Sequence, residues 1–184
     1  LVISMDEGRR ILTDHDIVIS QGEIQKVEKN TQLNGGAEII DAAGCLVTPG
    51  LVNTHHHLFQ SLTKAVPGGQ NALLFGWLQT LYPIWSRFGP EEIRVSTILG
   101  LSELALSGCT MSSDHLYLFP NGVTLDDTIH AAYEVGLRFY PTRGSMSIGE
   151  SLGGLPPDNL VEKENDIIKD CIRVVDKFND INPS

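Results

Sequence analysis

The sequence predicts an α/β protein in which a small β domain precedes a parallel sheet with helices on its outside. Short β-type runs separated by turn residues fill residues 1–48. From residue 49 to residue 184, short strands alternate with longer helical periods three times. Units of this kind form parallel sheets, and three of them supply part of an eight-stranded barrel or of an open doubly wound sheet.

The composition is that of a globular protein that avoids polyanions. The 184 residues are 41% apolar and carry a net charge of −10, which repels nucleic-acid phosphates and anionic lipid head groups. The three cysteines, Cys45, Cys109 and Cys171, are odd in number and form no CxxC pair, as is typical of a reducing cytoplasm. No apolar run approaches the roughly 20 residues that span a bilayer. We therefore expect a cytoplasmic protein that binds neither nucleic acid nor membrane.

The first domain is predicted to be a small antiparallel β unit. Ile17 begins the first clear β run, and the pair Gln21-Gly22 marks a turn after it. Strands are expected at residues 17–19, 24–27, 39–40 and 46–47. Pro49-Gly50 is a further turn signal, which places the domain boundary near Thr48.

Three consecutive histidines follow the first apolar run of the second domain. If residues 51–57 are extended, alternation places His55 and His57 on one side and His56 on the other. Two imidazoles on one side can share a metal ion. A catalytic zinc ion takes about three protein ligands and a water, so the pair predicts half of a metal site.

Helical periods follow the histidines. Residues 74–85 are rich in aromatic and apolar side chains, which indicates a segment packed on one side and overhanging something on the other. Pro90, followed by two glutamates, begins a helix that ends at Gly108. Its expected apolar face consists of Val95, Ile98, Leu99, Ser102, Ala105 and Leu106. A strand is expected at residues 109–114.

Two more helices and a strand complete the pattern. Asp126 and Asp127 favour a helix start, and Gly136 favours its end, with Ile129, Ala132 and Tyr133 as its expected face. A strand is predicted at residues 137–142. The last helix has the clearest period and is expected to lie across a sheet through Ile167, Ile168, Cys171, Ile172, Val174, Val175 and Phe178.

Polar side chains fall at the carboxyl ends of the three expected strands, where parallel α/β folds place their active sites. These are the pair His55/His57, the pair Asp114/His115, and Arg143. A single histidine such as His115 is more often structural than ligand-binding. Arg143 is equally well interpreted as a buried partner of Asp114.

Several motifs together resemble the opening of the amidohydrolase superfamily. Residues 41–44 and 47–57, which contain the HxH pair His55 and His57, are similar to the junction of its small β domain and its barrel. Further segments are similar to the 8-oxoguanine deaminase group of aminohydrolases: residues 60–63, 75–78, 107–110, 112–117 and 143–147. The resemblance covers most of the chain.

The resemblance implies the first part of a (β/α)8 TIM-type barrel, preceded by part of a small β-sandwich domain. It also implies one divalent metal ion, zinc or alternatively Fe²⁺, with His55 and His57 among its ligands. The family's remaining ligands, a histidine and an aspartate, and its proton-transfer residues come from later strands. No catalytic residue is therefore assigned within residues 1–184, and we expect the chain to be the N-terminal part of a longer protein.

The activity that the resemblance implies is hydrolytic deamination of an oxidised purine, with 8-oxoguanine as the first candidate. A bound metal would supply hydroxide by lowering the pKa of water to about 7. Gln60 would bond a ring edge, Trp77 would cover the heterocycle, and His115 or Arg143 would contact a carbonyl oxygen. The expected partner is a small heterocyclic substrate, and assembly into a homo-oligomer stays open.

Two alternatives stay open as well. Guanine, pterin or hydroxytriazine rings present similar polar edges, and a non-catalytic scaffold could keep the fold without the chemistry. The other zinc nucleobase deaminases use H-x-E with P-C-x-x-C, and neither motif occurs in this sequence.

Overall fold

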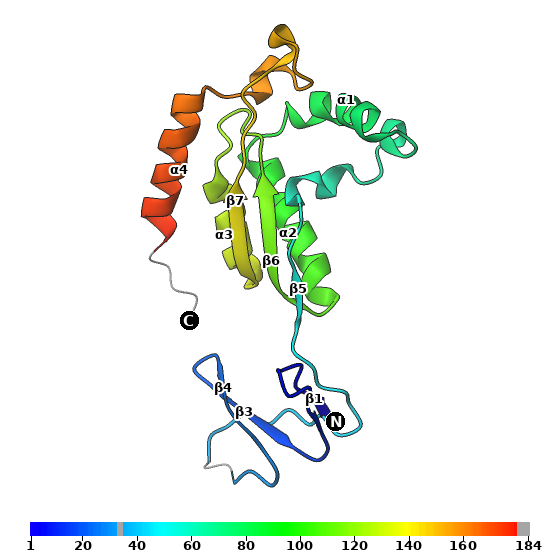
Figure 1. The fold of residues 1–184 in the computed structure, drawn as a ribbon, viewed down its shortest axis with the longest axis vertical. Helices are drawn as coiled ribbons and strands as arrows, with labels where there is room; N and C mark the ends of the chain where they lie inside the picture. The colour runs from blue at the N-terminus through cyan, green and yellow to red at the C-terminus, as the bar shows by residue number, and fades with distance from the viewer. Residues whose placement is uncertain (33–34, 180–184) are drawn as a thin grey trace. The chain divides into compact units, whose positions relative to one another are not determined.

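The computed structural model describes residues 1–32 and 35–179, which fall into two compact units (Figure 1). The first unit is Leu1–Gly50, and the second begins at Leu51. Within the described residues, none of the helices combines the length and the apolar character that crossing a bilayer requires.

The first unit contains two antiparallel strand pairs. β1 (Val2–Ile3) pairs with β2 (Ile11–Leu12), and β3 (Asp16–Ser20) pairs with β4 (Glu23–Glu28). Gln21 and Gly22 join the second pair, with φ of 52° and 78°. Two consecutive residues at positive φ are what a two-residue hairpin turn needs, so the predicted strands and turn are confirmed here.

The prediction of a strand at residues 39–40 is wrong. Ile39 and Ile40 are 74% and 84% exposed and pair with no strand in the described part of the unit. Val47 forms only an isolated parallel bridge with Val2. Apolar β-type residues make a strand only where a neighbouring chain supplies backbone hydrogen bonds, and the described residues supply none at residues 39–40.

The second unit is built on a parallel sheet in the order β5-β6-β7 (Figure 1). Its strands are β5 (Leu51–Asn53), β6 (Cys109–Leu116) and β7 (Arg138–Arg143). α2 (Pro90–Leu106) precedes β6 and packs on it, and α3 (Leu125–Val135) precedes β7 and packs on that strand. The predicted strand–helix alternation is therefore confirmed, and the mixed α/β arrangement matches the start of a TIM-type barrel.

Further helices lie in the connections after β5 and β7. η1 (Leu58–Thr63), η2 (Pro67–Gly69) and α1 (Leu74–Trp85) follow β5, whereas η3 (Glu150–Leu152), η4 (Asp158–Leu160) and α4 (Glu164–Phe178) follow β7. α1 buries Leu81, Tyr82 and Trp85, whereas Leu74 and Phe75 at its start are 64% and 69% exposed. Trp77 and Leu78 also pack against the core, so the predicted packing on one side is confirmed, and the overhang stays a prediction.

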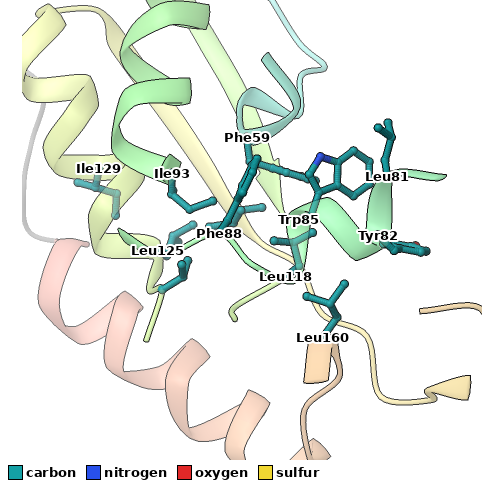
Figure 2. Close-up of a cluster of buried hydrophobic side chains, with 12 residues drawn as sticks. Phe59, Leu81, Tyr82, Trp85, Phe88, Ile93, Leu118, Leu125, Ile129 and Leu160 are labelled. Carbon is teal, nitrogen blue, oxygen red and sulfur yellow. The ribbon is translucent and has the colours of Figure 1, made fainter. Parts of the chain in front are cut away.

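The main core joins α1, η1 and the segment after β6 (Figure 2). The Phe59 and Trp85 rings meet edge to face with centroids 5.0 Å apart, and the Trp85 indole N–H donates to Thr63 Oγ1 at 3.1 Å. The buried members are Phe59, Leu81, Tyr82, Trp85, Phe88, Ile93, Leu116, Leu118, Val123, Leu125, Ile129 and Leu160. This core therefore anchors η1, the element that follows the three histidines.

The buried face of α2 differs from the predicted one. Leu106 is 90% exposed, whereas the buried residues are Ile93, Ser96, Thr97, Gly100 and Leu101. A Cβ on Gly100 would lie 2.6 Å from Leu58 Cδ2 and 2.8 Å from Ser61 Oγ. Because η1 lies so close to α2, only small side chains fit between them. The spacing of the large apolar residues in α2 therefore predicted the wrong buried face.

Replacing Gly100 by alanine is expected to destabilise the protein by about 1 to 3 kcal/mol, since the added methyl group overpacks a buried contact. The matched control is Gly76→Ala in α1, where the nearest atom to the new Cβ is 3.7 Å away. That change should be neutral or stabilising by up to about 1 kcal/mol because alanine favours helix. Denaturant unfolding of both variants measures the difference. Equal stability of the two would contradict the close packing of α2 on η1.

The faces of α3 and α4 also differ in part from the predictions. Tyr133 of α3 is 57% exposed. α4 fully buries none of its residues, but Val174 and Phe178 of its predicted face pack against the main core. Ion pairs also attach it: Asp126 of α3 pairs with Arg173 at 2.9 Å and with Lys177 at 2.5 Å. Its stripe of Ile168, Ile172 and Val175, each 56% or 57% exposed, has no partner among the described residues.

Candidate functional site

The three histidines lie directly after β5, at the carboxyl end of the sheet. The imidazoles of His55 and His57 have centroids 5.1 Å apart and planes at 88°. His56 lies against α2, with its Cε1 3.8 Å from the position that a Cβ on Gly100 would take. This is the arrangement that alternation along an extended segment predicts.

A backbone contact fixes the ring of His57. Its Nδ1 lies 2.8 Å from the carbonyl oxygen of His115. Because a carbonyl oxygen can only accept, Nδ1 carries the hydrogen and the lone pair of the neutral ring lies on Nε2. Such a nitrogen is a good ligand for a divalent ion, and histidine ligands commonly use their second ring N–H in this way. The donor set at His57 therefore fits a metal site.

His55 and His57 do not form a complete metal shell on their own. Among the residues that the structure describes, no group of three or more histidine, cysteine, aspartate or glutamate side chains is placed to hold a metal ion. The HxH spacing likewise predicts two of the ligands of a metal site and not the complete set.

Asp114 lies on the opposite side of β6 from His115 and is only 1% exposed. Its Oδ1 accepts the backbone N–H of Leu58 at 2.7 Å. Burial raises the pKa of Asp114 to about 7, although the backbone N–H groups of Leu58 and His115 act in the opposite direction. The carboxyl is therefore a buried structural link between β6 and η1.

The raised pKa of Asp114 predicts a pH dependence of stability. The folded state holds this proton more tightly than the unfolded chain, so the unfolding free energy should fall as pH rises from about 4 to about 7. The slope contributed by this group is at most about 1.4 kcal/mol per pH unit. Asp114→Asn should remove it, which denaturant unfolding at a series of pH values measures. An unchanged profile in the variant would contradict the raised pKa.

His115 and Tyr117 extend the cluster of rings around His57. The centroid of the His57 ring is 5.3 Å from that of His115 and 5.2 Å from that of Tyr117. Partial desolvation, followed by the neighbouring His57 and His55, lowers the pKa of His115. Gln60 joins the cluster through its Nε2, which donates to the Tyr117 hydroxyl at 3.4 Å.

Tyr117 is a site residue that the sequence analysis did not single out. It stands two positions after His115, so the period of two along β6 and its continuation was the signal that could have identified it. Burial raises the pKa of Tyr117, and its hydroxyl therefore stays protonated across the physiological range.

Gly144 allows the backbone after β7 to approach this cluster closely. Its N–H donates to the carbonyl of Leu116 at 2.7 Å. A Cβ at this position would lie 2.2 Å from His115 Nε2 and 2.7 Å from Tyr117 Cβ. A glycine is therefore needed for both rings to keep their places.

Arg143 is not brought to the histidines as a free side chain. Its side chain is 5% exposed and pairs with Glu162 at 2.5 Å and Asp170 at 3.0 Å. Burial alone would lower the pKa of Arg143, but the two carboxylates raise it above its usual value. The ion pair with Asp114 that the sequence left open is not formed. Arg143 instead donates to the carbonyl of Gly144 at 2.8 Å, behind His115.

Trp77 is also separate from the histidine cluster. Its ring packs on Trp85 with centroids 5.3 Å apart, and Trp85 in turn contacts Phe59. The structure thus brings together four of the predicted site residues: His55, His57, Gln60 and His115. Trp77 reaches His57 only through the rings of Trp85 and Phe59.

Comparison with known proteins places these features in a family. The model of the Amidohydrolase family matches residues 46–181. The chain is 46% identical to an 8-oxoguanine deaminase from Pseudomonas aeruginosa over 77% of the chain and 32% of that protein. It is 37% identical to an isoxanthopterin deaminase from an unknown prokaryotic organism over 80% of the chain and 32% of that protein.

A solved structure has a similar fold. The atrazine chlorohydrolase from Arthrobacter aurescens complexed with zinc is 28% identical, with a TM-score of 0.79 over 99% of this chain and 42% of that one. The chain spans about a third of the length of the curated relatives it matches, 32% for both deaminases. With the family model covering most of its residues and the HxH pair at the end of β5, the chain belongs to the amidohydrolase family.

Proposed function

We propose that the protein containing this chain is a metal-dependent aminohydrolase that deaminates an oxidised purine, with 8-oxoguanine as its substrate. The observation that carries the proposal is the His57 ring, whose Nδ1 is held by a backbone carbonyl at 2.8 Å and whose Nε2 is thereby free beside His55. The 46% identity to an 8-oxoguanine deaminase supports the choice of substrate.

His55 and His57 are the proposed ligands of one divalent ion, for which zinc is the first choice. Imidazole nitrogen suits zinc, and zinc accompanies a related chlorohydrolase structure. When bound, the ion supplies activation of water at neutral pH. The residues described here hold and orient the site, and none of them is assigned the proton transfer.

The proposed reaction replaces an exocyclic amine by oxygen. The oxygen of water forms a bond to the ring carbon of the amidine, and the bond from that carbon to the amine nitrogen breaks. One proton of the water leaves with the amine as ammonia, and the other ends on the ring nitrogen. The carbon becomes a carbonyl, so atoms and charge balance.

Gln60 and His115 are the proposed substrate contacts. The amide of Gln60 donates a weak hydrogen bond to Tyr117 at 3.4 Å. It can give up this bond and form one with the edge of the substrate ring. His115 is exposed beside His57 and can bond a carbonyl oxygen. Trp77 stays a prediction for covering the heterocycle. We do not retain direct contact for Arg143, because its guanidinium is buried in two ion pairs, and we propose that it supports the Gly144 backbone behind His115.

The test is ammonia release by the full-length protein from 8-oxoguanine, guanine, isoxanthopterin and a hydroxytriazine. We expect 8-oxoguanine to react fastest, release to stop after chelation, and zinc to restore it. Faster turnover of another ring would correct the substrate. No release from any of the four would overturn the deaminase proposal and favour the non-catalytic scaffold.

A further inference from the structure

The carboxyl of Asp114 accepts a hydrogen bond from the backbone next to His57. We propose that Asp114 is a positioning residue for the metal-binding pair, which holds the backbone at Leu58 and thereby fixes the orientation of the His57 imidazole. The inference rests on the proposed metal role of His57, and its test includes readouts that do not depend on that role.

Three hydrogen bonds join the end of β6 to the histidine segment. The N–H of His115 donates to the carbonyl of His56 at 2.9 Å. The Nδ1–H of His57 donates to the carbonyl of His115 at 2.8 Å. The N–H of Leu58 donates to Asp114 Oδ1 at 2.7 Å. His57 therefore stands between two bonded backbone positions: His56 is bonded to His115, and Leu58 is bonded to Asp114.

Of these three bonds, only the bond from Leu58 uses a side-chain acceptor. β5 ends at Asn53, so regular strand pairing does not hold the chain at residues 54–58. At His57 the backbone turns, with φ of −128° and ψ of 80°, and η1 begins at Leu58 without a side-chain cap from His57. Leu58 is fully buried, so its N–H depends on a protein acceptor, and Asp114 provides it from another strand.

The orientation of the His57 ring depends on this bond. A rotation at the link between His57 and Leu58 would carry the ring nitrogen away from the His115 carbonyl, and Nε2 would turn away from His55. Groups that orient a metal ligand in this way commonly alter metal affinity by about 10-fold to 100-fold when they are lost. Among the described residues Oδ2 of Asp114 has no hydrogen-bond partner, so the carboxyl makes its side-chain contribution through Oδ1.

The experiment compares two variants of the full-length protein, Asp114→Asn and Asp114→Leu. Asparagine keeps an oxygen acceptor at the same distance from the backbone, whereas leucine has a similar size without one. We expect zinc affinity, measured by competition with a chromophoric chelator, to stay within about threefold of wild type for Asp114→Asn. For Asp114→Leu it should fall about 10-fold to 100-fold. Equal affinities in both variants and wild type would overturn the proposal, as would equal losses in both variants.

A control separates positioning from general loss of a buried polar group. Thr128 of α3 is fully buried and donates to the carbonyl of Leu125 at 2.9 Å, away from the histidine segment. Thr128→Val should leave zinc affinity unchanged whatever it does to stability. An affinity loss in Thr128→Val as large as that in Asp114→Leu would assign the effect to destabilisation and overturn the proposal.

The metal-free wild-type protein gives an independent measurement, which also serves if Asp114→Leu fails to fold. Nitrogen-15 spectra of His57 should show one tautomer with the hydrogen on Nδ1, and the Leu58 amide should be protected from hydrogen exchange. A mixture of tautomers or rapid exchange at Leu58 would contradict the positioning role. Absence of zinc binding by the wild type would sink the proposed function, while these two measurements would still decide the role of Asp114.

Discussion

His57→Ala is expected to abolish ammonia release and to weaken zinc binding by more than about 100-fold, which exceeds the usual cost of losing an outer-shell partner. The change removes the imidazole whose Nε2 the His115 carbonyl leaves free, and the alanine offers no replacement ligand. Metal content after dialysis and initial rates of ammonia release from 8-oxoguanine measure the two effects.

The neighbouring histidine provides the control. His56 lies against α2, away from the His55/His57 pair, so His56→Ala should keep its bound metal and lose stability at most. If His57→Ala retains metal and turnover, the HxH assignment is wrong. If His56→Ala loses metal as completely as His57→Ala, the separation of the three histidines into two sides is wrong.

Arg143→Met is expected to destabilise the protein by about 3 to 5 kcal/mol, because it leaves the partly buried carboxylate of Glu162 without a cation and leaves Asp170 with Arg173 alone. Glu162 and Asp170 pair with this guanidinium at 2.5 and 3.0 Å, and they join the loop after β7 and the middle of α4 to the strand end. Thermal or denaturant unfolding measures the loss.

The matched control is Arg94→Met on α2. Arg94 also pairs with two glutamates, Glu134 at 3.0 Å and Glu91 at 3.4 Å, but its side chain is 41% exposed. Solvent screens such pairs, so the expected loss is below about 1 kcal/mol. If Arg143→Met changes the KM for the substrate without loss of stability, Arg143 contacts the substrate directly, and the structural role proposed for it is wrong.

Much of the fold could be predicted from local signals. Pro90 with its two glutamates and Gly136 at positive φ are the boundaries that the structure gives to α2 and α3. The Gln21-Gly22 turn and the strands on both sides of it could also be predicted, because turn-forming residues and apolar alternation act over a few residues. Such features depend on the chain's own covalent geometry and need no distant partner.

Which faces become buried could not be predicted from the same signals. α2 buries Ser96, Thr97 and Gly100 because η1 approaches too closely for larger side chains, although Val95 and Leu99 have the higher hydrophobicity. Ile39-Ile40 has strand composition and no strand partner among the described residues. Burial depends on which surfaces meet, and composition within one element does not specify its neighbours.

For the candidate site, the sequence by itself determined the residue types and their spacing: an HxH pair after an apolar run, a glutamine three positions later, and polar residues at two further strand ends. The tertiary structure decided which of them meet. Pairing of β5 with β6 brings the His115 carbonyl to His57 and Asp114 to Leu58, over 56 or more residues of sequence. The tertiary structure also places Arg143 beside Glu162 and Asp170. A buried guanidinium needs carboxylate partners, and only the fold brings these two carboxylates to it.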